Sequence, residues 1–306
     1  MNVKYKYTLL VIWECKQIDV TMKKTAPITL LIVIITIVTS YAQQHKTNSL
    51  TSNTIKLDST NYVSFIKNLP SFSMFGDYYL ITGTSTKSNA FTSTGSDAKF
   101  EIGFKQRINN LNLPFNIFPF FTYRQKAFWD VYRESLPFRE LNYNPGFGVA
   151  KLFFNKQGFN YALYASFEHE SNGRDEENSR TWNFLALTFF KPIDNTMQLR
   201  AKTWLPVGKM EGNEDILSYR GFFNVGLTYK AHHKLFFDID LQPAYDTKLQ
   251  GNVKAGVSFR LSKNSNQFLY LQYFGGYSED LINYNQSVSN IRIGFIIKDL
   301  IFNFKD

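Results

Sequence analysis

The chain has 306 residues, including 30 Phe and 18 Tyr, yet its mean hydropathy is only −0.25. This combination excludes a bundle of apolar membrane helices and is typical of strands that are apolar on one face and polar on the other. The formal net charge of +9 is modest and forms no dense basic stripe, so we expect no nucleic-acid partner.

The first distinctive segment is residues 22–42, MKKTAPITLLIVIITIVTSYA. Two lysines precede an apolar run from Ile28 to Val38, and small residues follow, which is the pattern of a secretory signal peptide. The alternative is a membrane anchor, but the run is short for a span of about 20 residues. We therefore expect residues 1–42 to be an upstream segment and signal peptide. They hold five Lys, one Glu, one Asp and the single cysteine, Cys15, so the remainder has a net charge of +6 and no thiol chemistry.

Beyond residue 42 the sequence alternates between apolar and polar residues. In residues 251–261, GNVKAGVSFRL, every second residue from Val253 is apolar, and the residues between them are mostly polar. Period-two alternation predicts β-strands. The predicted strands are 73–84, 97–108, 116–129, 142–155, 159–171, 181–191, 196–206, 217–230, 234–246, 251–262, 267–277 and 290–301.

The predicted connections alternate between long and short. The long ones include 85–96, 130–141, 172–180, 207–216 and 278–289, and the short ones include 156–158, 231–233 and 263–266. Long loops at one end and tight turns at the other predict an all-β fold, a 12-stranded antiparallel transmembrane β-barrel. A soluble sandwich or lipocalin-like barrel is the alternative, but neither needs so many aromatic residues. We expect a periplasmic lead-in at 43–72, the barrel at 73–306, and both ends of the barrel on the periplasmic side.

Residues 167–184, FEHESNGRDEENSRTWNF, contain the parts of a hydrolytic triad: His169 as base, Ser171 as nucleophile and Asn183 as the group that orients the base. His169 and Ser171 share the parity of the apolar residues Leu163, Ala165 and Phe167, so we expect them on the outer, lipid-facing wall near the long loops. A nucleophile that opens into the membrane boundary suits a lipid ester. The alternative interpretation is a polar ring that only marks the membrane interface.

The run HESNGRDEENSRTWN resembles the signature of the outer-membrane phospholipase A family, in which H-x-S-N-G-R leads through S-R-x-W to an Asn. The stretches SLPFRELNYNP, at 135–145, and GGYSEDLINYNQ, at 275–286, also resemble that family. The resemblance extends from about residue 115 to the end of the chain. It implies a phospholipase A1/A2, a hydrolase of phospholipid acyl esters at the sn-1 and sn-2 positions that depends on calcium and works as a homodimer in the Gram-negative outer membrane.

The resemblance also implies roles for individual residues. The Gly173 amide would stabilise the oxyanion. Calcium would be held by the Ser179 hydroxyl, the Arg174 carbonyl and the Ser135 carbonyl of a second copy, and oxygen ligands suit this hard cation. Gln125 would lie in the dimer interface.

Two features of the prediction stay open at this point. Glu176 stands where the family has Asp, which puts a second calcium position in doubt. A non-catalytic barrel, such as a porin or structural protein, and a related esterase acting on other lipids are the alternative functions, although the presence of all three triad residues argues against the first. Because an even number of strands puts both ends of the barrel in the periplasm, we expect the 172–180 loop and the active site on the extracellular side.

Overall fold

The structure, a computed structural model, describes residues 60–87, 89–109, 113–156, 158–210, 212–246, 249–262 and 265–299. The expected signal peptide and most of the expected lead-in lie outside these ranges. Within them, no helix is long and apolar enough to cross a membrane.

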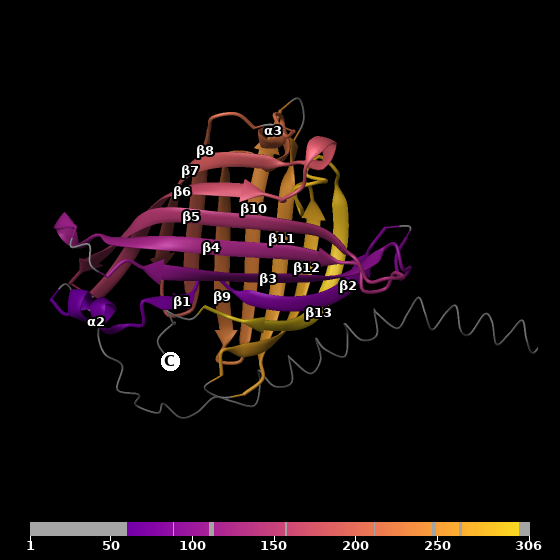
Figure 1. The fold of residues 1–306 in the computed structure, drawn as a ribbon. Coiled ribbons are helices and arrows are strands. Elements are labelled where there is room, and N and C mark those ends of the chain that lie inside the picture. Colours follow the sequence, from indigo (N-terminus) through magenta and orange to yellow (C-terminus); the bar gives the residue numbers. More distant parts are fainter. Residues whose placement is uncertain are drawn as a thin grey trace, which may run out of the picture. The chain divides into compact units, whose positions relative to one another are not determined.

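Twelve strands form a closed antiparallel barrel, in which each strand pairs with the next and the last pairs with the first (Figure 1). This confirms the predicted fold class. The strands are β2 (Tyr78–Ser85), β3 (Ser96–Arg107), β4 (Phe118–Trp129), β5 (Phe138–Asn155), β6 (Gly158–Ser171), β7 (Thr181–Pro192), β8 (Met197–Val207), β9 (Phe223–His232), β10 (Leu235–Tyr245), β11 (Leu249–Arg260), β12 (Gln267–Gly276) and β13 (Val288–Ile297). Short elements add to them: α2 (Tyr62–Asn68), β1 (Phe72–Met74), α3 (Ile216–Arg220), and the 3-10 turns η1 (Pro114–Asn116) and η2 (Glu176–Asn178).

The two ends of the barrel differ in their connections. We call the end that carries the connections 86–95, 130–137, 172–180, 208–222 and 277–287 the long-loop end, and the opposite end the short-turn end. The alternation expected from the sequence is not perfect, because the β10–β11 connection at the long-loop end spans only 246–248. The β3–β4 connection at the short-turn end, 108–117, is also longer than a tight turn because it contains η1.

Two predicted strands are broken or shortened at their start in the structure. The strand predicted at 73–84 is broken into β1 and β2, because Gly76 adopts a positive φ of 77° between them. The strand predicted at 217–230 begins only at Phe223, since residues 216–220 form α3. Ile216 is fully buried, and Leu217 and Tyr219 pack against the same core, so burial at the mouth of the barrel decides the local structure here.

The wall of the barrel is apolar outside and charged inside. Large apolar side chains are exposed on the outer face, among them Leu80, Ile102, Phe121, Phe147, Phe167, Leu185, Leu187, Leu205, Phe237, Ile239, Leu241 and Phe295. The inner face carries ion pairs, which include Lys99–Glu279, Arg124–Glu101, Lys202–Glu168, Lys254–Asp240 and Arg292–Asp97. An exposed apolar surface of this extent indicates an apolar surrounding medium.

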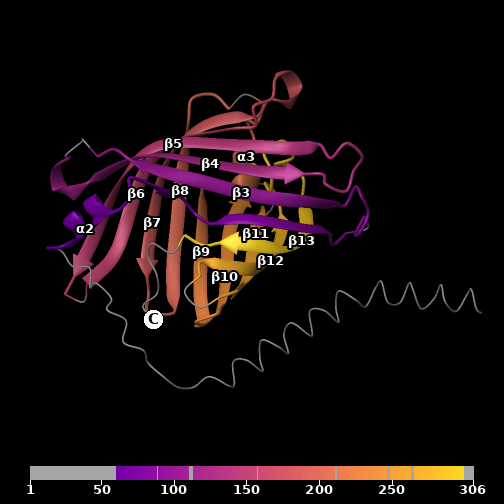
Figure 2. The same ribbon diagram turned by 60° about the horizontal axis from the view of Figure 1, so that its bottom comes forward.

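Apolar clusters pack inside the wall at both ends, and between them lies a cavity of about 1590 Å³. At the long-loop end, the cluster joins β7 and β8 to α3 and the 277–287 loop through Trp182, Phe184, Ala186, Trp204, Ile216, Leu281 and Tyr284. At the short-turn end, Tyr62 of α2 packs on Phe118 and Leu152, so α2 lies against the ends of β4 and β5 (Figure 2). The long-loop end is therefore filled by side chains.

Candidate active site

The antiparallel pairing of β6 and β7 places His169 directly opposite Asn183. The His169 Nδ1 and Asn183 Oδ1 atoms lie 2.8 Å apart. A carboxamide oxygen can only accept a hydrogen bond, so Nδ1 carries the proton and Nε2 is left as an acceptor. This is the tautomer that a general base requires.

Ser171 lies two residues beyond His169 on the same strand and opposite Thr181. The directions of Glu168 and Glu170, which precede and separate His169 and Ser171, show which face of β6 is the outer one. Glu168 points inward to Lys202, with Nζ and Oε1 2.8 Å apart, and Glu170 points inward to Arg220. Because side chains alternate along a strand, His169 and Ser171 lie on the outer wall. Phe167 beside them is 44% exposed and Leu185 is 54% exposed, so the surroundings of the two polar side chains are apolar.

The 172–180 loop that follows Ser171 is organised by the buried side chain of Asn172. Its Nδ2 donates to the Asn178 carbonyl at 2.9 Å, and its Oδ1 accepts from the Arg180 amide at 3.0 Å. The Asn172 amide donates to the Arg180 carbonyl at 3.1 Å. One side chain thus ties both ends of the loop together. The sequence signature includes this Asn, but spacing alone did not predict its structural role.

Gly173 has a positive φ of 66°, a conformation that glycine adopts without strain. A Cβ there would lie 3.0 Å from the Tyr143 ring, so a side chain would also be crowded. Among the described residues, no acceptor is bonded to the Gly173 amide. The amide is therefore a free donor two residues from Ser171.

The predicted calcium ligands lie in two loops of the long-loop end. Ser179 and Arg174 belong to the 172–180 loop, and Ser135 lies exposed in the 130–137 loop with a positive φ of 66°. Among the described residues, neither the Ser179 hydroxyl nor the Arg174 carbonyl takes part in a hydrogen bond, so both oxygens are open to a cation. A hydroxyl and carbonyls completed by water fit calcium. No cluster of three or more His, Asp or Glu side chains suited to a metal occurs in the described part of the chain.

Gln125 lies on the outer face of β4, between the inward-pointing Arg124 and Lys126. Arg124 forms an ion pair with Glu101 inside the barrel. The Gln125 Oε1 accepts a hydrogen bond from the Tyr123 hydroxyl at 2.9 Å. The amide nitrogen of Gln125 has no acceptor among the described residues.

The structure adds two buried acids that sequence reasoning did not single out. Glu279, in the 277–287 loop, forms ion pairs with Lys99 and Arg292 inside the barrel. Glu140, at the start of β5, is completely buried and contacts Arg174 of the 172–180 loop, with Arg174 Nε and Glu140 Oε2 3.2 Å apart. Both lie in stretches that carry the family resemblance, and that was the only signal for them in the sequence.

Known proteins are similar to this chain in sequence and in fold. The sequence model of the phospholipase A1 family matches residues 41–297. The phospholipases A1 of Klebsiella pneumoniae and of Escherichia coli (strain K12) are each 30% identical over 187 residues, which are 58% of this chain and 62% of the relative. The aligned part thus spans about three-fifths of these relatives.

Two solved structures have a similar barrel. The outer membrane phospholipase A from Escherichia coli superposes with a TM-score of 0.66 at 24% identity, covering 76% of this chain and 100% of that chain. The Salmonella typhi outer membrane phospholipase dimer with bound calcium gives a TM-score of 0.67 at 23% identity, covering 78% and 98%. At these identities the structural likeness concerns the fold.

Proposed function

Because the chain belongs to the phospholipase A1 family, we propose that it hydrolyses the acyl esters of phospholipids, at the sn-1 and sn-2 positions, in the outer membrane. The observation that carries this proposal is the hydrogen bond between His169 and Asn183, 2.8 Å long, beside Ser171 on the apolar outer wall. A lipid ester in the membrane boundary reaches this face directly, whereas a solute inside the barrel does not.

In the proposed mechanism, the Ser171 hydroxyl attacks the ester carbonyl while His169 Nε2 takes its proton. The imidazolium then gives this proton to the departing lysophospholipid oxygen, and the acyl group stays on Ser171. Water, deprotonated by His169, releases the fatty acid and restores the serine. Asn183 holds the imidazole in position but supplies no negative charge, so stabilisation of the developing oxyanion must come from elsewhere. The free amide of Gly173 is our candidate.

A calcium ion would be held by the Ser179 hydroxyl and the Arg174 carbonyl, with the Ser135 carbonyl contributed by a second copy. When bound, it would supply positive charge for the oxyanion. The 172–180 loop fixes the two ligands of one copy relative to each other, because Asn172 ties the loop at both ends.

Calcium removal tests the proposed function. We expect the purified protein to release fatty acid from detergent-dispersed phospholipid in the presence of calcium, and a chelator should abolish the release. Restoring free calcium should restore activity. A non-catalytic barrel would release no fatty acid at any calcium concentration. A related lipid esterase would hydrolyse a different lipid ester and leave phospholipid intact.

We also propose that the long-loop end, and with it the active site, lies on the extracellular side. A peptide tag inserted after Glu177 should then bind antibody on intact cells, since that residue is exposed in the 172–180 loop. A tag in the 193–196 turn at the short-turn end should bind antibody only after permeabilisation. The reverse labelling would contradict this orientation.

We propose further that activity requires a homodimer in which Gln125 forms hydrogen bonds across the interface. Such bonds within a membrane contribute about 1 kcal/mol each, so Gln125→Ala should weaken dimerisation by about fivefold for each bond that is lost. Cross-linking should increase when calcium and a non-hydrolysable phospholipid analogue are added together. Gln267→Ala is the control, because that exposed residue lies at the short-turn start of β12. A calcium-independent, fully active monomer would contradict the dimer mechanism.

A further inference from the structure

A β-bulge at Arg139 interrupts the pairing of β4 with β5. Phe128 pairs with Glu140 and Trp129 pairs with Phe138, so Arg139 has no partner on β4. A bulge changes the alternation of side chains. Phe138 is exposed on the outer wall and stacks on Trp129, whereas the next two side chains, Arg139 and Glu140, both point into the mouth of the barrel.

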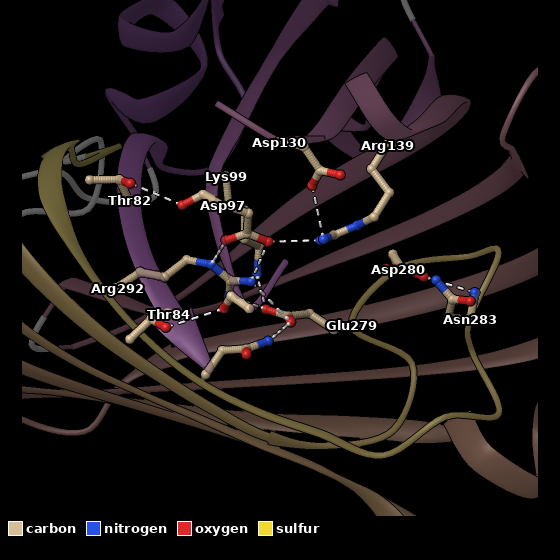
Figure 3. Close-up of polar contacts among 12 residues, drawn as sticks. Thr82, Thr84, Asp97, Lys99, Asp130, Arg139, Glu279, Asp280, Asn283 and Arg292 are labelled. Atoms are coloured by element: carbon tan, nitrogen blue, oxygen red, sulfur yellow. Dashed lines mark hydrogen bonds and ion pairs between the residues drawn. The ribbon is translucent and has the colours of Figure 1, made fainter. Parts of the chain in front are cut away.

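The Arg139 side chain fixes the bulge to the interior of the barrel (Figure 3). Its guanidinium bridges two carboxylates, Asp97 at 2.7 Å and Asp130 at 3.1 Å. Asp97 in turn is held by Arg292 at 2.7 Å, and Arg292 also contacts Glu279 at 2.6 Å. The bulge is therefore anchored to the buried charges of β3 and β13 and to the 277–287 loop.

The two carboxylate oxygens of Glu140 differ in their contacts: Oε1 accepts hydrogen bonds, whereas the buried Oε2 has no hydrogen-bond partner among the described residues and makes only an ion-pair contact. Oε1 accepts hydrogen bonds from the Asn142 side chain at 2.8 Å and from the Ile282 amide at 3.1 Å. Oε2 faces Arg174, whose Nε lies 3.2 Å away, and Arg174 Nη2 also donates to the Arg139 carbonyl. Arg139 and Glu140 thus both contact Arg174. The backbone carbonyl of Arg174 accepts no hydrogen bond among the described residues.

We propose that Glu140 is a positioning residue for the calcium site: it fixes the Arg174 side chain, and through it the backbone that presents the Arg174 carbonyl and the Gly173 amide. The inference rests on the proposed function for the identity of the ligand. Arg174 is pinned by two contacts from the bulge, and Asn172 closes the loop at its ends, so the carbonyl is held before any ion arrives. Residues that hold metal ligands in place, without binding the metal themselves, typically influence metal affinity.

The charge of Glu140 is the part that can be tested separately from its packing. Glu140→Gln keeps the size of the side chain and an oxygen for the Ile282 amide, but it removes the negative charge that faces Arg174. Arg174→Ala removes the same contact from the exposed side while keeping the backbone carbonyl. Asp238→Asn is the control, because it breaks the Asp238–Lys298 ion pair, 2.7 Å long, near the short-turn end of the barrel.

The experiment measures calcium binding to the full-length protein in detergent by calorimetry, and the calcium dependence of fatty-acid release in parallel. We expect Glu140→Gln and Arg174→Ala each to weaken calcium binding by about tenfold. Glu140→Gln should keep turnover at saturating calcium within about threefold of wild type. The double variant should bind calcium no more weakly than the worse single variant, because both changes remove one interaction. Asp238→Asn should bind calcium as the wild type does.

The outcomes separate the two proposals. Wild-type calcium affinity in Glu140→Gln and Arg174→Ala, additive losses in the double variant, or an equal loss in Asp238→Asn would each overturn the positioning role. If Glu140→Gln fails to fold, Arg174→Ala alone decides. If the wild type binds no calcium, the inference fails as well. If calcium binds and responds to Glu140 as expected but no phospholipid is cleaved, the positioning role holds and the proposed function is wrong.

Discussion

Replacing Ser171 with alanine should reduce the rate of phospholipid hydrolysis by about a thousandfold or more, since loss of one member of a catalytic triad removes most of its contribution. Ser171 is the only hydroxyl on the His169 side of β6 at the long-loop end, where Nε2 is free to take a proton. His169→Ala should cause a similar loss. Asn183→Ala should be milder, because it removes one hydrogen bond that orients the ring and leaves the nucleophile and base in place.

Ser166→Ala is the matched control for this experiment. Ser166 lies on the same strand, but its hydroxyl points inward and donates to Glu168 at 2.8 Å. We expect this variant to keep wild-type turnover. Each variant should still show the heat-modifiable mobility of a folded barrel in electrophoresis. If Ser171→Ala or His169→Ala kept most of the wild-type activity, the proposed triad would be ruled out.

Replacing Glu279 with glutamine should lower the free energy of unfolding by about 3 kcal/mol, because removal of one partner leaves buried charges uncompensated. Glu279 is 5% exposed, and it lies 3.0 Å from Lys99 and 2.6 Å from Arg292. Asn290 also donates to it, at 2.6 Å. Chemical denaturation in detergent, followed by tryptophan fluorescence, measures the change.

Glu279 also makes the free energy of unfolding depend on pH. Burial raises the pKa of Glu279, but the positive charges of Lys99 and Arg292 outweigh burial and hold it well below its ordinary value of 4.5. In the unfolded chain Glu279 therefore takes up its proton first as the pH falls. Its contribution to stability is complete above pH 4.5 and decreases below that value, towards the lower pKa of the folded state.

The variant should consequently lose less stability on acidification than the wild type does. Glu177→Gln is the control, because Glu177 is exposed in the 172–180 loop and lacks these cationic partners. Equal acid sensitivity in wild type and Glu279→Gln would contradict the stabilising role of the buried pair, as would an unchanged free energy of unfolding at neutral pH.

The strands were predictable from the sequence because each has one apolar and one polar face, a pattern written within a dozen consecutive residues. The position of His169 opposite Asn183 followed from the same alternation and the length of the 172–180 loop. The resemblance to the phospholipase family, which the family match bears out, added the roles. These signals are local in the sequence. They suffice to predict a barrel wall, because the wall consists of hairpins whose two strands are neighbours in the sequence.

The features that sequence reasoning missed depend on contacts between distant residues. Leu217 and Tyr219 alternate with polar residues as in a strand, yet they form α3 because the apolar cluster at the mouth binds them. The bulge at Arg139 lies ahead of the strand start predicted at 142, where the alternation is broken. Arg292 pairs with Asp97, which lies near the opposite end of the barrel sequence, and no pattern within either strand reveals this pair.

The pairing of β13 with β2 has a consequence for how the barrel forms. The bond between Arg292 and Asp97 joins residues 195 positions apart, and a contact across so long a segment forms only after the intervening chain has been ordered. The wall therefore closes as one late event, when the final strand meets the first. Until that moment the cations of the lumen face water, and the mouth lacks the charges that anchor the bulge. Kinetic experiments should find that competence for catalysis arises together with closure, so that an open sheet of twelve strands is an inactive folding intermediate.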